Sequence, residues 1–252
     1  MKIWAIGDLH LSFGIPNKSM DVFGKGWENH AERLAENWKK LITDEDLVLI
    51  PGDISWAMHL KDVKPDLDWI HALPGTKLLL RGNHDYWWSS MKQIKSILPP
   101  SLHLIQNNAF DWNGISVAGA RLWDSKEYSF GQYIDYVPNE RARVLTAHDE
   151  NLEEAERIFE RELGRLEISL KCLNPKASHR IVMTHYPPIG ATLEEDSRVS
   201  KILEKYGVNI CVFGHLHNLK EDFKLFGHKN GVRYILTSCD YLKCMPIEVL
   251  EL

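Results

Sequence analysis

The stretch Leu78-Leu79-Leu80-Arg81-Gly82-Asn83-His84-Asp85 decides the fold, because an apolar run ends in a glycine and three polar side chains follow at once. The apolar run predicts a buried β-strand, and the glycine lets the backbone turn sharply without a Cβ clash. The polar residues then project from the carboxyl end of the strand, where open α/β sheets bind their ligands. Taken alone, a polar turn without function explains this stretch equally well.

Four other apolar runs end in the same way, and the recurrence favours a functional interpretation. They are residues 2–6 before Gly7-Asp8-Leu9-His10, 47–50 before Pro51-Gly52-Asp53, 180–183 before Thr184-His185, and 210–213 before Gly214-His215-Leu216-His217. Asp8 and His10 are two positions apart, which puts both side chains on one face of an extended backbone. Five strand ends therefore carry residues that can bind a metal.

The segments between these strands predict an α/β fold. Helical spacing or capping signals favour helices at 29–41, 65–72, 89–98, 152–170 and 197–206. Further strands are expected at 102–106 and 115–118, with antiparallel edge strands at 222–226, 232–236 and 247–250. We predict a two-sheet β-sandwich flanked by helices, with the site at the carboxyl ends of the central strands.

Composition fits one large globular domain over residues 1–252. The chain is 44% hydrophobic and 26% charged, and its net charge of -5 offers no general attraction for nucleic acid. The first apolar run is too short for a signal peptide or a membrane span, which predicts a cytoplasmic protein without a membrane partner. The cysteines lack zinc-ribbon or redox spacing and predict reduced thiols; they are Cys172, Cys211, Cys239 and Cys244.

Two long irregular segments are candidates for the rim of the site. Residues 11–28 contain Gly, Pro and Asn, and residues 121–149 are aromatic and charged without a clear period. Loops of this length in a compact domain are usually functional. We expect 121–149 to form a cap or substrate loop.

The strand-end residues form a set that suits transition metals. The set holds two carboxylates, one amide and five imidazoles: Asp8, Asp53, Asn83, His10, His84, His185, His215 and His217. Carboxylate oxygen with neutral imidazole suits Mn, Fe or Zn, whereas Mg or Ca sites use oxygen almost alone. Since the set is too large for one tetrahedral ion and a carboxylate can bridge two ions, we expect a two-metal hydrolytic centre.

The ordered blocks also resemble the calcineurin-like metallophosphoesterase superfamily. Its signature runs D-x-H, G-D, G-N-H-D or G-N-H-E, a single H, and G-H-x-H, and each block occurs here in order between residues 8 and 217. The resemblance implies a four-layer αββα fold and a phosphoesterase that hydrolyses a small phosphorylated substrate, a monoester or a diester. A hydroxide generated between two cations roughly 3.5 to 4 Å apart would attack phosphorus in line.

The resemblance also implies a role for each residue. Asp8, His10 and His217 would hold one metal, and Asn83, His185 and His215 the other, while Asp53 bridges them. His84 resembles the imidazole that contacts phosphate and protonates the leaving group, with Asp85 orienting it.

The second block, Gly52-Asp53-Ile54-Ser55-Trp56, lacks the arginine of the Ser/Thr protein phosphatases, and the third ends in Asp85 instead of Glu. Both differences favour the bacterial-type phosphohydrolases. Arg81 is a further cation near the site, although arginines at strand ends are more often structural. Two alternatives stay open: a nuclease on short oligonucleotides, which the charge disfavours, and a non-catalytic scaffold of the same fold.

Overall fold

Two β-sheets lie face to face in the computed structural model, which describes residues 1–15, 18–135 and 152–252. The first sheet has the order β11-β1-β2-β3-β4, with β1 Lys2–Ala5, β2 Leu47–Pro51, β3 Thr76–Leu80, β4 Leu102–Ile105 and β11 Ile247–Glu251. The second has the order β5-β6-β7-β8-β10-β9, with β5 Ala109–Trp112, β6 Ile115–Ala120, β7 His179–Thr184, β8 Ile210–Phe213, β9 Gly227–Lys229 and β10 Val232–Leu236.

The central strands of each sheet run parallel. Strands β1 to β4 pair in parallel, as do β6, β7, β8 and β10, while β11, β5 and β9 add antiparallel edges. The carboxyl ends of each parallel set therefore gather at one edge. The two edges meet in space, since His185 Nδ1 of the second sheet lies 3.0 Å from the Pro51 carbonyl oxygen of the first.

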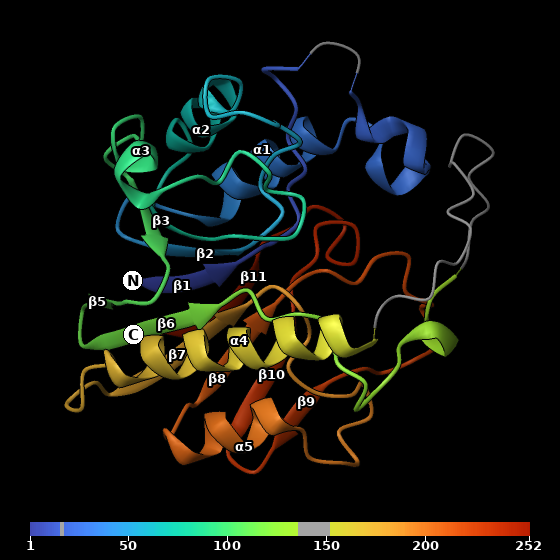
Figure 1. The fold of residues 1–252 in the computed structure, drawn as a ribbon. Helices are drawn as coiled ribbons and strands as arrows, with labels where there is room; N and C mark the ends of the chain where they lie inside the picture. The colour runs from blue at the N-terminus through green and yellow to red at the C-terminus, as the bar shows by residue number, and fades with distance from the viewer. Residues whose placement is uncertain (16–17, 136–151) are drawn as a thin grey trace.

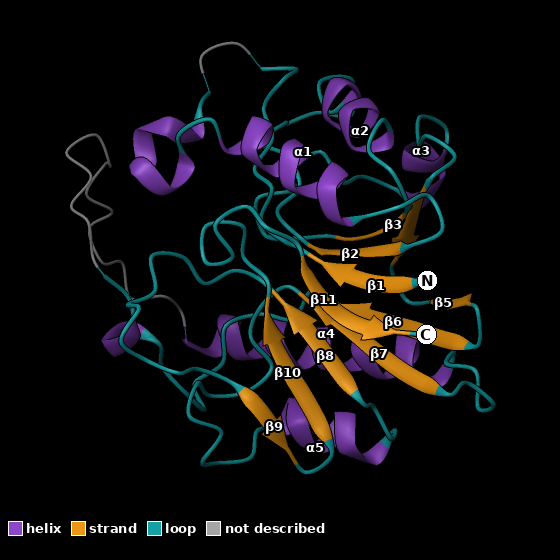
Figure 2. Cartoon of the chain, turned by 180° about the vertical axis from the view of Figure 1, so that it is seen from behind, coloured by secondary structure: helices purple, strands orange, loops and turns teal. Residues whose placement is uncertain are grey.

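Helices cover the outer face of each sheet (Figure 1). Helices α1, α2 and α3 lie over the first sheet and α4 and α5 over the second, as the view from behind also shows (Figure 2). Their bounds are α1 His30–Leu41, α2 Lys64–His71, α3 Met91–Lys95, α4 Leu152–Lys171 and α5 Arg198–Lys205. The predicted four-layer αββα arrangement is confirmed.

Three apolar clusters hold these layers together. The middle cluster fills the space between the sheets and includes Leu49 and Leu78 from one sheet and Ile181 and Val212 from the other. Alternate residues of the same strands point outward, so that Val48 packs beneath the helices instead. Strands that are buried on both faces read as continuous apolar runs, which is why the sequence identifies them so clearly.

The carboxyl-terminal part of the chain departs from the prediction. Residues 222–226 form no strand; the backbone turns there and β9 begins at Gly227. Strand β10, predicted as an antiparallel edge, pairs in parallel with β8 and antiparallel with β9, so it lies inside the sheet. The prediction also omitted β5 and β9 themselves. Only β11, antiparallel to β1, is the edge strand that was expected.

Two further observations concern the sequence predictions. In the described part of the chain, no helix is both long enough and apolar enough to cross a bilayer. All four cysteines are free thiols. Of the predicted cap at 121–149, residues 136–149 lie outside the described residues, and so do residues 16 and 17 of the 11–28 loop.

Candidate metal centre

Each candidate ligand lies in the loop after a strand, as the sequence predicts. Asp8 and His10 follow β1, Asp53 follows β2, Asn83 and His84 follow β3, His185 follows β7, and His215 and His217 follow β8. Several have a left-handed backbone, with φ of 54° at Asp8, 44° at His10, 50° at Asp53 and 75° at His215. Non-glycine residues rarely adopt this conformation, and those that do cluster at functional sites.

Two glycines allow these loops to approach one another closely. A Cβ atom on Gly82 would overlap the backbone nitrogen and the carboxylate of Asp53, and a Cβ on Gly214 would overlap the carboxylate of Asp8. A larger residue at either position would push a candidate ligand away. Close packing therefore requires glycine at these two positions of the sequence signature.

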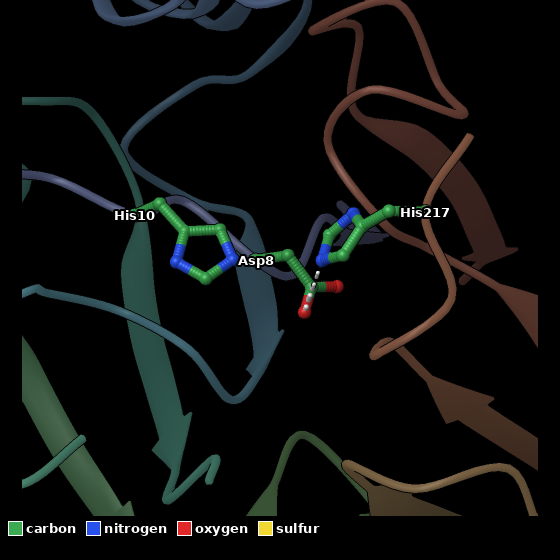
Figure 3. Close-up of side chains that lie close together, drawn as sticks. All are labelled: Asp8, His10 and His217. Atoms are coloured by element: carbon green, nitrogen blue, oxygen red, sulfur yellow. Dashed lines mark ion pairs between the residues drawn. The ribbon is translucent and has the colours of Figure 1, made fainter. Parts of the chain in front are cut away.

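One group of candidate ligands consists of Asp8, His10 and His217 (Figure 3). Their ligand atoms all lie within 4.8 Å of one another, and His217 Nε2 is 3.7 Å from Asp8 Oδ1. Asp8 and His10 are buried and His217 is half-buried. Figure 3 shows the two rings on either side of the Asp8 carboxylate. One oxygen and two nitrogens thus converge on one small volume.

A second group surrounds the Asn83 side chain. Asn83 Oδ1 lies 2.6 Å from His185 Nε2 and 3.1 Å from His215 Nδ1. His185 Nε2 is also 3.5 Å from Asp53 Oδ1. Asp8, Asp53 and His185 form a second buried trio whose ligand atoms lie within 4.8 Å.

Asp53 lies between the two groups and presents a different oxygen to each. Its Oδ2 is 3.7 Å from His10 Nε2, and its Oδ1 is 3.5 Å from His185 Nε2. The backbone N–H of His84 donates to Oδ1 at 2.8 Å and fixes the carboxylate. Asp53 is therefore placed to serve both groups at once.

Burial determines the charge of these side chains. It lowers the pKa of His185 to about 3 and holds the pKa of His10 and of His215 well below the usual value. These imidazoles are neutral at pH 7, so a ring nitrogen can donate its lone pair to a metal. Burial raises the pKa of Asp8 to about 7 with a further contribution from the nearby Asp53 carboxylate, although His217 partly opposes the shift. Close buried carboxylates among neutral imidazoles suit a divalent cation, which offsets their repulsion.

His84 lies beside the ligands without joining either group. Its ring centroid is 5.7 Å from that of His10 and 4.6 Å from that of Trp56. Among the described residues its buried Nδ1 has no hydrogen-bond partner, and burial lowers the pKa of the ring. The ring therefore lies close to the centre with one ring nitrogen unpaired.

Asp85 contacts the backbone of the loops. Its carboxylate accepts hydrogen bonds from the N–H groups of Gly82 (2.7 Å), Ile54 (2.9 Å) and Ser55 (3.1 Å), and from the Trp87 indole (2.9 Å). No hydrogen bond to the His84 ring accompanies these four in the described structure. Asp85 thus connects the loop after β3 to the loop after β2. It can position His84 only through the backbone of the loop that carries both residues.

Asp240 belongs to the site and was not predicted. Its Oδ1 lies 2.8 Å from His217 Nδ1, and its Oδ2 accepts from the Asn218 N–H at 2.9 Å. Although burial lowers the pKa of His217, this hydrogen bond and the nearby carboxylates raise it to about 9. A signal was available in the sequence, because the apolar run of β10 ends in Thr237-Ser238-Cys239-Asp240. It is a sixth strand end of the same type.

Two tryptophans line the centre. Trp27, in the predicted rim segment 11–28, packs edge-on against the rings of His10 (5.7 Å) and His217 (5.5 Å). Trp56 stacks on His10 at 4.9 Å. These rings exclude water from one side of the ligand cluster and fix the imidazoles.

Two cavities flank the centre. One, of about 460 Å³, is lined by Trp27 and Asp240 together with Phe23, Phe223 and Tyr241. The other, of about 280 Å³, reaches the candidate ligand His215 and has aromatic walls formed by Trp123, Tyr128, Phe130 and Tyr186. Part of the 121–149 segment, residues 123–125, 128–131 and 134, therefore contributes to a cavity at the site.

The site thus combines a helix-flanked double sheet with carboxylates and imidazoles clustered at the strand ends, a donor set that can bind divalent metals. The family comparison agrees: residues 1–219 match the calcineurin-like phosphoesterase family. The chain belongs to this family.

The individual relatives match a smaller part of the chain than the family does. The chain is 35% identical over 83 residues to the Gene 66 protein of Mycobacterium phage D29, which is 33% of this chain and 40% of that protein. It is 36% identical over 86 residues to the Gene 66 protein of Mycobacterium phage L5, covering 32% and 39%. The match thus spans about two-fifths of each curated relative.

Among solved structures, the fold is similar to that of phosphopantetheinyl hydrolase (PptH) from Mycobacterium tuberculosis. The TM-score is 0.56, with 13% identity over 99% of this chain and 95% of that one. At this identity the likeness concerns the fold alone.

Proposed function

We propose that the chain hydrolyses a small phosphomonoester or phosphodiester at a centre of two divalent cations. The observation that carries the proposal is the position of Asp53, which presents Oδ2 to His10 and Oδ1 to His185 at 3.7 and 3.5 Å. A carboxylate shared in this way is the expected bridge of a two-metal centre.

The candidate ligands form two groups that share Asp53. One cation would be held by Asp8, His10 and His217, and the other by Asn83, His185 and His215, with Asp53 common to both. Bound there, divalent cations lower the pKa of a water ligand towards neutrality and neutralise phosphoryl oxygens. The mixture of carboxylate and imidazole donors favours Mn, Fe or Zn.

The remaining polar groups support the reaction from beside the ligands. We assign His84 to the phosphate and the leaving group, since its ring lies beside the candidate ligand His10 without joining either ligand group, and an imidazole so placed can transfer a proton. Asp85 is a positioning residue, because its four hydrogen bonds hold the loop that carries His84. Asp240 holds the His217 ring in one orientation through Nδ1.

The aromatic cavity next to His215 supports a substrate whose leaving group carries a flat or apolar part. PptH acts, by its name, on a phosphopantetheinyl group, so a phosphopantetheinyl diester belongs in the substrate panel. The free thiols support work in a reducing compartment, and we propose the cytoplasm.

The test is a screen of the purified chain, loaded in turn with Mn²⁺, Fe²⁺ and Zn²⁺, against aryl and alkyl monoesters, diesters, nucleotides and a phosphopantetheinyl diester. We expect at least one class to be turned over, with two metal ions per chain. Asp53→Asn should lose both ions and the activity, because the bridge serves both. Full metal occupancy in Asp53→Asn contradicts the two-cation centre.

The same screen decides between the alternatives. Turnover of short oligonucleotides in preference to every small ester indicates a nuclease. Tight metal binding without turnover of any phosphoester indicates a scaffold. Both outcomes contradict the proposed small-molecule esterase.

A further inference from the structure

A third cavity, with a polar lining, lies at the strand-end edge outside the candidate metal centre. Its volume is about 90 Å³, and its polar lining consists of Arg81 after β3, Gln106 and Asn107 after β4, Arg121 after β6, and Glu162 and Arg165 on α4. None of these residues is a candidate metal ligand.

The charges around this cavity do not balance. Three arginines and one carboxylate line the cavity, and that carboxylate, of Glu162, is 1% exposed. Glu162 Oε1 accepts from Arg165 Nη1 at 2.6 Å and lies 3.7 Å from Arg121 Nη2, so a single carboxylate serves two arginines. No second carboxylate lines the cavity. The lining therefore carries an excess of positive charge.

Among the described residues, no carboxylate forms an ion pair with Arg81. Its Nε is buried and has no hydrogen-bond partner among the described residues. Leaving a buried donor unsatisfied costs about 1 to 3 kcal/mol, and more for a charged group. An anion in the cavity would give this donor a partner and offset the positive charge of Arg81.

The cavity is small. Its volume of about 90 Å³ suits a compact oxyanion. Guanidinium groups match the paired oxygens of phosphate with their planar donors. We propose that this cavity is a second anion site, which binds inorganic phosphate between Arg81, Arg121 and Arg165.

The site lies next to the loops that carry candidate ligands. Arg81 immediately precedes Gly82 and Asn83. The carbonyl oxygen of Arg121 accepts hydrogen bonds from the N–H groups of His185 (3.1 Å) and Tyr186 (3.0 Å). Phosphate in the cavity would thus be held by residues that adjoin Asn83 and support His185. It would bind beside the candidate ligand loops without contacting a metal.

The test measures phosphate binding to a metal-free chain, so that phosphate cannot bind through a metal ion. In the full-length Asp53→Asn chain with chelator present, inorganic phosphate is titrated by calorimetry in a buffer free of other oxyanions. We expect one phosphate per chain. Adding Arg81→Gln should weaken phosphate binding at least ten-fold. The control, Arg157→Gln, removes the same charge from the exposed face of α4 and should leave phosphate binding unchanged. Phenyl phosphate, whose ring does not fit, should bind much more weakly than inorganic phosphate.

Absence of saturable binding, or equal affinity in the Arg81→Gln and Arg157→Gln variants, overturns the proposal. Phenyl phosphate binding as well as inorganic phosphate assigns the site to the phosphoryl group of a larger ligand and also overturns it. If circular dichroism shows that Arg81→Gln does not fold, Arg165→Gln replaces it, because that side chain is 46% exposed. None of these readouts requires hydrolysis, so their failure is distinct from failure of the proposed esterase.

Discussion

The buried Nδ1 of His84 has no partner in the described structure, and its ring centroid lies 5.7 Å from that of the candidate ligand His10. If it protonates the leaving group, it matters most when the leaving oxygen is basic, and general acid catalysis contributes about 10² to 10⁴-fold. His84→Ala should keep both metals and the fold, lose about that factor in kcat on an alkyl ester, and lose far less on a nitrophenyl ester.

The control for this comparison is His71→Ala, at an exposed histidine hydrogen-bonded to Ser101. It should leave the rates on both esters unchanged. Loss of metal from His84→Ala would make His84 a ligand. An equal loss of rate on both esters would make it a group that positions phosphate.

Asp240 is expected to control the affinity of the metal that His217 binds. A carboxylate hydrogen-bonded to the second nitrogen of a ligand histidine fixes the ring, and its removal typically costs about 10- to 100-fold in metal affinity. Asp240→Asn should therefore weaken one of two metal sites by that factor, measured by competition with a chromophoric chelator. Glu221→Gln, at the exposed partner of Lys243, should not change it. Equal affinity in both variants would leave Asp240 with a purely structural role.

At the scale of the elements, β3 carries a buried charge that makes stability depend on pH. The Lys77 side chain is 0% exposed, and burial lowers its pKa from 10.5 to about 8. The unfolded chain therefore binds the proton more tightly than the folded chain between these pH values, so stability rises as the pH increases from 8 to 10.5. The shift corresponds to roughly 3 kcal/mol.

Lys77→Met should remove this dependence. We expect the variant to be more stable than the parent chain at pH 7, by up to about 3 kcal/mol, and the difference to shrink as the pH approaches 10.5. Urea denaturation of both proteins across this range measures it. A constant difference would mean that the Lys77 amine is not desolvated in the folded chain.

The elements that the sequence predicted well are those whose burial dictates their pattern. Strands β1, β2, β3, β7 and β8 are apolar on both faces and end in polar loops, so each could be recognised without knowing its neighbours. Asp53 and His215 could be assigned as candidates for the same reason. Their convergence could not be derived from the residues alone, because it depends on how the two sheets pack.

The missed strands have another cause. Strands β5 and β9 are short and partly exposed, and pairing with a neighbour determines their conformation. Each is joined to that neighbour by an Asn-Gly turn with positive φ at both residues, Asn113-Gly114 and Asn230-Gly231. This dipeptide favours the two-residue hairpin, so a local signal existed. Recognising Asn230-Gly231 would also have placed β10 inside the sheet.

For the molecule as a whole, the candidate centre depends on the packing between the sheets, since each sheet supplies part of the ligand set. Leu49 is completely buried in the cluster between the sheets. Leu49→Ala should lower the free energy of unfolding by about 2 to 5 kcal/mol and weaken metal binding as well. Leu41→Ala, at a side chain that is 36% exposed, should change stability by only about 0.5 kcal/mol.

Chemical denaturation and metal titration of the two leucine variants check this expectation. Metal that binds only the folded chain should restore part of the lost stability in Leu49→Ala. A Leu49→Ala chain that is destabilised but binds metal with unchanged affinity would show that the ligand loops keep their geometry independently of the sheet packing.

The pairing of β1 with β11 has a consequence for how the protein is made. These strands come from opposite ends of the described chain, with Lys2 opposite Glu251. A chain that folds during synthesis must keep one side of β1 unpaired until residues 247–251 leave the ribosome. An exposed strand edge of this kind can pair with another chain. Products of termination before residue 247 are therefore expected to associate through β1, whereas a chain that contains residues 247–251 closes that edge with β11.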